Sequence, residues 1–224
     1  MIAKIFNYIK FLRGIDAKRF FYLNYFCPAV IRTDNSKLIP YKNAVVDIAP
    51  NAKLYLSGGD IEIGCDKLKK SRAETRLRLR ENAVWCSVGG TRISYGTTLE
   101  ILNNAILNSK FFTMNSNCTM VIAKCINIGR DVMIGRSAII YDSDFHQLLD
   151  MDGNITNHSS PVTIDDHVWL ATNTMVMKGS SIGSGAMIGA NSVVSGKITA
   201  NTMYYTKNTP VTRENYGTWK REKP

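Results

Sequence analysis

A repeat of six residues organises the second half of the chain. Only Ile, Leu or Val occupies the nine anchor positions, which are 128, 134, 140, 164, 170, 176, 182, 188 and 194. Because six is a multiple of the two-residue period of a strand, every anchor points to the same side of a short strand. The residue after most anchors is small, which marks a turn where glycine adopts unusual backbone conformations at the least cost. The pattern predicts a parallel β-helix of stacked coils.

The repeat is weaker before residue 120. Positions 48 and 54 keep the six-residue spacing, and so do Ser87, Ile93 and Leu99. We interpret them as early coils with a degraded pattern. The segment 67–80 contains no hexad, and we expect a loop or an exposed, charged strand there.

One irregular stretch interrupts the repeat without changing its phase. Ile140 and Ile164 are four hexads apart, but the residues between them lack the pattern and are rich in Asp, Asn, Ser and His. An irregular polar segment inside a regular solenoid is most simply an extruded loop, here near 142–161. Long loops on rigid scaffolds often carry function.

The first 40 residues follow a different pattern. Apolar side chains recur at helical spacing over 2–12 with basic residues between them, and an aromatic stretch follows over 18–26. We interpret this part as one or two short helices packed on the main domain, or as a basic amphipathic helix at a membrane surface. The expected organisation is an N-terminal amphipathic and aromatic segment over 1–40, a β-helix domain over 41–203 and a C-terminal tail over 204–224.

Composition narrows the class of protein. The chain has 224 residues, 45% hydrophobic and 21% charged, which suits one globular domain. No apolar run approaches the roughly 18 residues of a membrane-spanning helix, and the N-terminus lacks a signal-peptide pattern. The five cysteines include no C-x-x-C pair, so we expect free thiols in a reducing compartment and no metal site. These features favour a cytoplasmic protein.

The net charge of +10 is unevenly distributed. Basic residues gather in 1–40, 66–82 and the last 24 positions, whereas 128–200 is acidic. Nucleic acid, acidic lipid head groups and an anionic cofactor would all be attracted by such charge. Charge alone does not choose among them. We expect no nucleic acid and regard peripheral membrane contact as an open alternative.

The hexads and the run PVTIDDHVWLA over 161–171 resemble the hexapeptide-repeat acyltransferases, above all the sugar and polysaccharide O-acetyltransferases. The loop motif D-F-H-x-L-x-x-x-x-G-x-I-x-N over 144–157 is similar to that of capsule-modifying enzymes. The resemblance implies an all-β fold, a left-handed parallel β-helix of hexapeptide repeats. It also implies acetyl-CoA as co-substrate, a sugar or polysaccharide acceptor, and a homotrimer with active sites between subunits.

The resemblance also implies a set of site residues. His146 takes the place of the catalytic base, and Asp142 and Asp144 are candidates for orienting it or for binding the acceptor. The remaining candidates concern the coenzyme: Trp169 as a channel wall, Ala171 and Thr172 as backbone donors for the oxyanion, Thr172 and Ala190 for the pantetheine arm, and Lys178, Lys207 and Arg213 for the phosphates.

The implied reaction is chemically consistent with these residues. A sugar hydroxyl is a poor nucleophile at neutral pH, and histidine has a near-neutral pKa suited to a general base. We therefore expect an acetyl-CoA-dependent O-acetyltransferase that acts by direct transfer in capsule, lipopolysaccharide or other surface-glycan biosynthesis. Three alternatives stay open. They are N-acetylation of an amino sugar, a non-catalytic binding module, and a zinc enzyme, which would need His158 and His167 to converge with His146.

Overall fold

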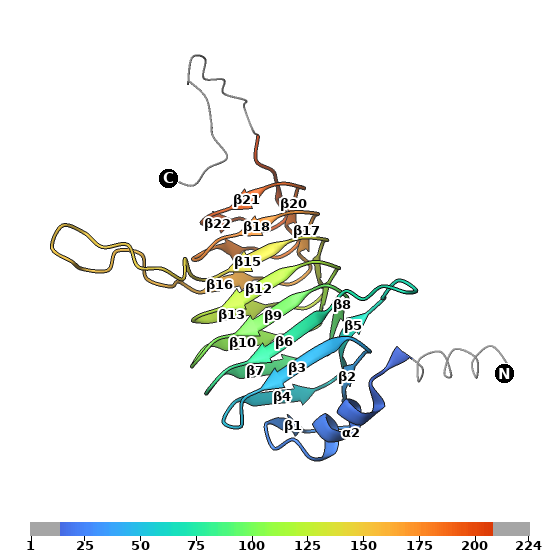
Figure 1. Ribbon diagram of the computed structural model, residues 1–224. Helices are drawn as coiled ribbons and strands as arrows, with labels where there is room; N and C mark the ends of the chain where they lie inside the picture. Colours follow the sequence, from blue (N-terminus) through green and yellow to red (C-terminus); the bar gives the residue numbers. More distant parts are fainter. Residues whose placement is uncertain (1–13, 208–224) are drawn as a thin grey trace, which may run out of the picture.

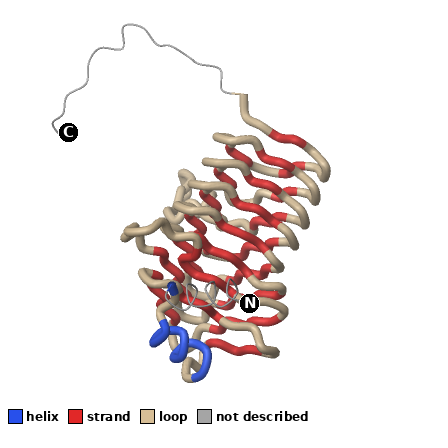
Figure 2. The backbone as a smooth tube through the Cα atoms, turned by 90° about the vertical axis from the view of Figure 1, so that its right-hand side faces the viewer, coloured by secondary structure: helices blue, strands red, loops and turns tan. Residues whose placement is uncertain are grey.

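The chain winds into a parallel β-helix, a tube of stacked coils with three flat sides (Figure 1). The computed structural model describes residues 14–207. Each coil contributes one strand to each of three parallel sheets, in a fixed order along the chain. A view from the side shows the coils rising one above another, with a short helix at one end (Figure 2). No helix in residues 14–207 is long and apolar enough to cross a membrane.

The strands of each sheet follow the axis of the tube. The first sheet contains β1 (Val30–Arg32), β4 (Lys53–Ser57), β7 (Val84–Val88), β10 (Ile106–Ser109), β13 (Cys125–Ile128), β16 (Val162–Ile164), β19 (Ser181–Ile182) and β22 (Lys197–Ile198). The second sheet contains β2 (Leu38–Pro40), β5 (Ile61–Cys65), β8 (Thr91–Ser94), β11 (Phe112–Met114), β14 (Val132–Ile134), β17 (Trp169–Leu170), β20 (Met187–Ile188) and β23 (Met203–Tyr204). The third sheet contains β3 (Ala44–Ile48), β6 (Thr75–Leu79), β9 (Thr98–Ile101), β12 (Thr119–Ile122), β15 (Ile139–Tyr141), β18 (Met175–Val176) and β21 (Val193–Val194).

The interior of the tube is apolar because alternate strand residues point inward. The nine hexad anchors are confirmed as core residues, and at most 3% of any of them is exposed. Anchors of adjacent coils stack: Ile128 lies opposite Ile164, and Ile164 lies opposite Ile182. Burying a side chain of this size contributes about 1.5–3 kcal/mol. The repeat therefore produces one continuous core along the axis.

The corners between sheets differ from the expectation in one respect. Positive φ angles occur at the third residue after an anchor, not at the first, as at Asp131, Ser137, His167, Asn173 and Asn191. Short polar residues tolerate this left-handed conformation better than most. The residue directly after an anchor is small for another reason. A Cβ atom at Gly135 would lie 2.7 Å from the Leu170 carbonyl oxygen of the next coil, so close packing of coils selects glycine there.

The β-helix begins at Val30, earlier than position 41, because β1 and β2 pair with β4 and β5. The segment 30–40 therefore belongs to the first coil and not to a separate N-terminal part. Ahead of it, the helix α2 (Ala17–Tyr25) starts at Asp16, whose side chain accepts the Arg19 N–H at 3.0 Å. This helix lies on β2 and buries Leu23 against the end of the core. The helical pattern expected over 2–12 lies outside the described residues.

The segment 67–80 is part loop and part strand. Alternate residues of β6 point inward and are buried, while its arginines point outward. Arg78 Nε lies 3.0 Å from an Asp47 carboxylate oxygen, and Arg78 Nη1 lies 3.7 Å from Glu100. The charged pattern thus belongs to one face of a half-buried strand.

The irregular stretch leaves the tube as a long arm (Figure 1). It departs after β15, at the corner between the third and first sheets, and returns as β16. The coils on either side still pair in register, β15 with β18 and β13 with β16. The expected loop near 142–161 is confirmed, and it presents its side chains beside a rigid corner.

Candidate active site

Polar contacts close the root of the arm. The Ser160 N–H donates to the Asp142 carbonyl at 3.0 Å, and the hydroxyl oxygens of Ser143 and Ser159 lie 2.9 Å apart. A single antiparallel bridge joins the two sides further out. The arm is therefore a strap held at its base, and residues near that base have defined positions.

Asp142 is fully buried at this root. Its carboxylate accepts three backbone N–H groups of the preceding coil, from Ala123 at 2.7 Å, Lys124 at 2.8 Å and Cys125 at 2.7 Å. Asp142 therefore cannot bind an acceptor as expected, because no part of its side chain reaches the surface. Asp142 instead fixes the place where the arm leaves the tube.

Asp144 is the centre of a second set of contacts, at the surface. Its carboxylate accepts from Lys178 Nζ at 2.6 Å and from Asn157 Nδ2 at 2.9 Å. The Lys178 ammonium, and then the Asn157 amide, lower the pKa of Asp144 from its ordinary value. Lys178 Nζ also donates to the Asn157 carbonyl at 3.0 Å. Its charge is thus committed to the arm, which argues against the expected role at a coenzyme phosphate.

His146 lies exposed on the arm, two residues after Asp144. Its ring makes no hydrogen bond to any residue of the described chain. A cavity of about 310 Å³ opens beside it, lined also by Ala123, Ser159 and His158. The residue therefore lines this cavity while its ring has no hydrogen-bond partner among residues 14–207.

The backbone of His146 is held from two sides. The Asn157 side-chain amide donates to the His146 carbonyl at 2.8 Å. The preceding Phe145 has a φ of +61°, a costly conformation for a bulky residue, and its ring packs edge-on against Tyr141 with centroids 5.1 Å apart. Strain that persists beside a candidate catalytic group is typical of functional sites.

Asn157 is the residue that sequence reasoning passed over. Besides its bonds to Asp144 and His146, its Oδ1 accepts the Leu148 N–H at 2.7 Å. It therefore joins the two sides of the arm around His146. The sequence did point to this residue, since Asn157 is the last residue of the loop motif that begins at Asp144.

The expected coenzyme residues lie at another edge of the tube. Ala171, Thr172 and Ala190 are stacked at the corner between the second and third sheets, where the Thr172 carbonyl accepts the Asn191 N–H at 3.1 Å. Within residues 14–207, the N–H groups of Thr172 and Ala190 donate to no protein atom. They are therefore available to a ligand running along this corner.

Trp169 lies on the outer face of the second sheet and is 44% exposed. Met133 and Met187 flank it on the adjacent coils, and Met203 continues the row. An exposed apolar row of this kind on a sheet face indicates a surface that something else covers.

One chain does not bring the two groups of residues together. The arm carrying His146 leaves at one end of the third-sheet strands, and the corner of Ala171, Thr172 and Ala190 lies at the other end. Lys207 is exposed beyond β23, and Arg213 lies outside the described residues. His167 faces solvent with Nδ1 2.7 Å from Asp131, away from His146, as its hexad position predicts.

Comparison with known proteins gives relatives with this repeat. Residues 161–196 match the family model of the bacterial transferase hexapeptide (six repeats). A Schizosaccharomyces pombe protein named as an acetyltransferase is 31% identical over 65% of this chain and 69% of its own length. The galactoside O-acetyltransferase of Escherichia coli K12 is 30% identical over 48% of this chain, and the polysialic acid O-acetyltransferase of Neisseria meningitidis is 27% identical over 47%. The chain spans about half the length of these last two relatives.

A solved structure gives the same fold. The polysialic acid O-acetyltransferase OatWY superimposes with a TM-score of 0.53 over 84% of this chain and 90% of that one, at 20% identity. The likeness concerns the architecture, the left-handed parallel β-helix implied by the resemblance. Because the hexad core is buried as expected and a relative matches over more than two thirds of its length, the chain belongs to the family of hexapeptide-repeat acetyltransferases.

Proposed function

We propose that this protein is an acetyl-CoA-dependent O-acetyltransferase acting on a sugar hydroxyl, with His146 as the general base. The observation that carries the proposal is the unpartnered His146 ring beside a cavity, on an arm clamped to the β-helix. The sugar and polysaccharide acceptors named for the relatives support the substrate class. A surface glycan or its precursor is the acceptor that fits these relatives.

The reaction needs only one proton acceptor and one oxyanion donor. His146 takes the proton of the sugar hydroxyl as its oxygen attacks the thioester carbonyl carbon. The carbon–oxygen bond forms, the carbon–sulfur bond breaks, and the coenzyme A thiolate leaves with the proton returned from His146. Transfer is direct, because the hydroxyls of Ser143 and Ser159 near His146 bond to each other and not to its ring.

The donor coenzyme lies along the corner that offers free N–H groups. Thr172 supplies the oxyanion contact and Ala190 a contact to the pantetheine arm, with Trp169 as the wall beside them. Lys207 and Arg213, on the tail, remain the candidates for phosphate contacts. Since these groups and His146 occupy different edges of one chain, the complete site requires a second copy.

We propose that the assembly is the homotrimer that the family resemblance implies. Leu148, Leu149 and Met151, in the middle of the arm's sequence, are fully or largely exposed. The apolar row of Met133 and Trp169 on a neighbouring copy offers them a matching surface. Such packing places His146 of one subunit opposite the coenzyme corner of the next.

The role of His146 is tested by replacing it with Ala and with Gln. We expect thiol release from acetyl-CoA in the presence of sugar acceptors to fall by at least about 100-fold in both variants, the usual contribution of a general base. The melting temperature should not change, because the ring has no partner in the described chain. Exposed His167, which lies beside Asp131 and away from His146, is the matched control when replaced by Gln.

Paired acceptors with a hydroxyl or an amine at the same carbon decide between O- and N-acetylation. Faster turnover of the amine would favour the N-acetyltransferase alternative. Undiminished turnover in both His146 variants would overturn the assignment of the base.

We further propose that the enzyme works in the cytoplasm at an acidic membrane surface. All five cysteines are free thiols, as in a reducing compartment. On α2, Phe21, Tyr22 and Tyr25 are each more than half exposed, and the Arg32 guanidinium lies 5.3 Å from the Tyr25 ring centre. Aromatic side chains with cations beside them suit the head-group region of a bilayer with anionic lipid.

Vesicle co-sedimentation tests this contact. We expect the protein to pellet with vesicles containing phosphatidylserine and to remain in solution with pure phosphatidylcholine. Replacing Phe21 and Phe26 by Ser should reduce the pelleted fraction several-fold, since each ring removes apolar area from water. Phe111→Ser, which alters an exposed ring on a coil, is the control. Equal pelleting of both variants, or self-association that depends on Phe21 and Phe26, would contradict the proposal.

A further inference from the structure

The outer faces of the three sheets differ in chemistry. In the later coils, the second sheet presents Met133 and Trp169, and the third sheet presents Ile139, Met175 and Val193. On the first sheet, the residues in register across the outer face are polar: Asn108, Asn127, Thr163 and Ser181. Apolar faces suit contact with other copies of the chain, whereas the first-sheet face suits water or a hydrated ligand.

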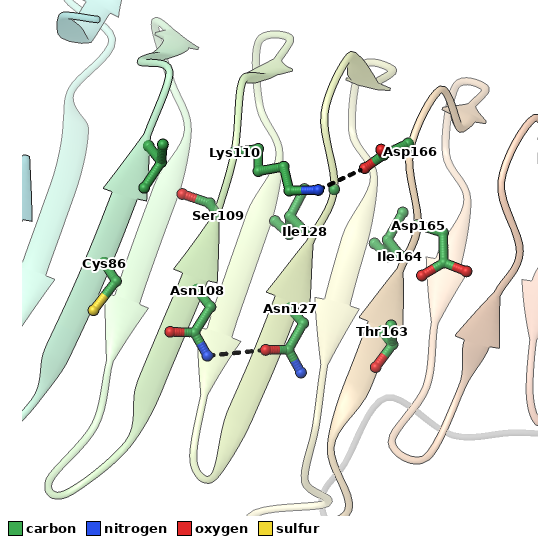
Figure 3. Close-up of a pocket in the computed structure, with 12 residues that line it drawn as sticks. Cys86, Asn108, Ser109, Lys110, Asn127, Ile128, Thr163, Ile164, Asp165 and Asp166 are labelled. Atoms are coloured by element: carbon green, nitrogen blue, oxygen red, sulfur yellow. Dashed lines mark hydrogen bonds and ion pairs between the residues drawn. The ribbon is translucent and has the colours of Figure 1, made fainter. Parts of the chain in front are cut away.

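A groove of about 410 Å³ lies on this polar face. Figure 3 shows Asn108, Asn127 and Thr163 side by side across β10, β13 and β16. At one side of the groove, Lys110 Nζ reaches over an intervening coil to within 3.4 Å of an Asp166 carboxylate oxygen (Figure 3). Parallel strands and this ion pair thus define a trough with a row of uncharged polar groups along it.

The groove and the cavity at His146 share the same sheet. Ala123, in the bend two residues before β13, lines the His146 cavity, and Ile128, the last residue of β13, lines the groove. The two residues are five positions apart, and because 123–124 form a bend, the distance between them is at most about 16 Å at 3.3 Å per residue. A single sugar ring cannot fill both places, whereas an oligosaccharide can lie across the strand.

The free groups in the groove match sugar hydroxyls. Asn108 Nδ2 donates to Asn127 Oδ1 at 2.9 Å, which leaves the Asn127 amide hydrogens and the Thr163 hydroxyl without a partner in the described chain. Val88, more than half exposed, supplies an apolar contact of the kind that the carbon face of a sugar ring makes.

The charge of the groove selects against an anionic glycan. Its lysine, Lys110, is paired with Asp166, whose carboxylate also accepts the Arg130 N–H at 2.7 Å. The Asp165 carboxylate, which also lines the groove, has no cationic partner among residues 14–207. Lys110 and Arg130 offset the charge of Asp166, and the unpaired Asp165 carboxylate is left to repel a polymer with a carboxylate on every unit.

We propose that the first-sheet groove binds the chain of a neutral oligosaccharide acceptor while its reacting sugar lies at His146. The inference rests on the proposed function and adds acceptor length and charge to it. Asn127 and Thr163 then favour long neutral acceptors over single sugars and over acidic polymers.

The test begins with binding and ends with turnover. Labelled protein is applied to an array of neutral and acidic glycans of one to six units, and the retained glycans serve as acceptors. We expect neutral glycans of three or more units to be retained. In the variant N127A/T163A, the ratio of kcat/KM for the longest acceptor to that for its single sugar should fall about tenfold, as expected for two neutral hydrogen bonds.

Asn51→Ala is the matched control, because Asn51 is an exposed asparagine on an early coil that hydrogen-bonds to another asparagine: its Nδ2 donates to Asn82 Oδ1 at 3.0 Å and its Oδ1 accepts the Asn82 N–H at 3.4 Å. It should leave the ratio unchanged. Retention of acidic glycans only, retention of none, or an unchanged ratio in N127A/T163A overturns the groove assignment. If transfer to any sugar still depends on His146, only the groove fails; if no acceptor supports His146-dependent transfer, the proposed function itself fails.

Discussion

Asp142 and Asp144 stand two residues apart on the arm and have opposite environments. Asp142 is buried, and three backbone N–H groups satisfy its charge. Asp144 stays at the surface, where the side chains of Lys178 and Asn157 bind it. The first carboxylate therefore maintains the fold, whereas the second stays at the surface, two residues before His146.

This difference predicts different responses to the same substitution. Asp142→Asn should lower the free energy of unfolding by about 2–4 kcal/mol, because hydrogen bonds to a charged group contribute about 1.5–3 kcal/mol each and are not additive. Asp144→Asn should leave stability nearly unchanged, since a surface ion pair contributes little. Urea denaturation of both variants measures the effect. Equal stability of the two variants would contradict the assignment of Asp142.

At the scale of the element, adjacent coils approach each other most closely just after the hexad anchors. Beneath Gly135, the atoms nearest to an added Cβ are backbone atoms of Leu170, Ala171 and Thr172, at 2.7–2.8 Å. Leu170 and Ala171 are held by backbone hydrogen bonds to adjacent coils, so these atoms cannot move aside without weakening those bonds. The absence of a side chain at Gly135 thus allows the two coils to lie at their close spacing.

Gly135→Ala should therefore destabilise the protein by about 1–3 kcal/mol, the usual cost of overpacking. Gly14→Ala is the control, because its nearest neighbour would be a Tyr41 side-chain atom at 3.4 Å, an ordinary contact. Thermal unfolding followed by circular dichroism compares the two. A G135A protein that melts with the wild type would show that the coils can separate locally.

The later coils could be predicted from the sequence, and the earlier ones only in part. Buried Trp85 occupies the interior of an early coil, and its indole N–H donates to buried Ser109 at 2.9 Å, a pair that the hexad pattern does not contain. The loop motif over 144–157 was enough to identify His146 as a candidate. The burial of Asp142 depends on N–H groups 17 to 19 residues earlier, which only the folded coil brings near.

At the scale of the molecule, the later coils present two apolar sheet faces and one polar face. The row of Met133, Trp169, Met187 and Met203 is continuous along the second sheet. A three-sided tube with this distribution suits a closed ring, in which two faces meet neighbours and the third faces solvent. The proposed acceptor groove would then remain accessible in the assembled enzyme.

Light scattering on the purified protein should give three times the 25.0 kDa mass of one chain. Met133→Lys, which places a charge in the apolar row, should shift the mass toward that of one chain. Asn127→Lys on the polar face should leave it unchanged. A wild-type mass of one chain, or dissociation caused by Asn127→Lys and not by Met133→Lys, would contradict the proposed arrangement.

The arm leaves and rejoins the tube at one corner, and the strands on either side keep the register of an uninterrupted coil. The register of the β-helix therefore does not depend on the segment inserted at the base of the arm. Segments of other lengths can be grafted there while the same polar closure at Asp142 and Ser160 is retained. In such a molecule, the arm can change in length and sequence while the β-helix keeps its architecture, so the two parts can evolve separately.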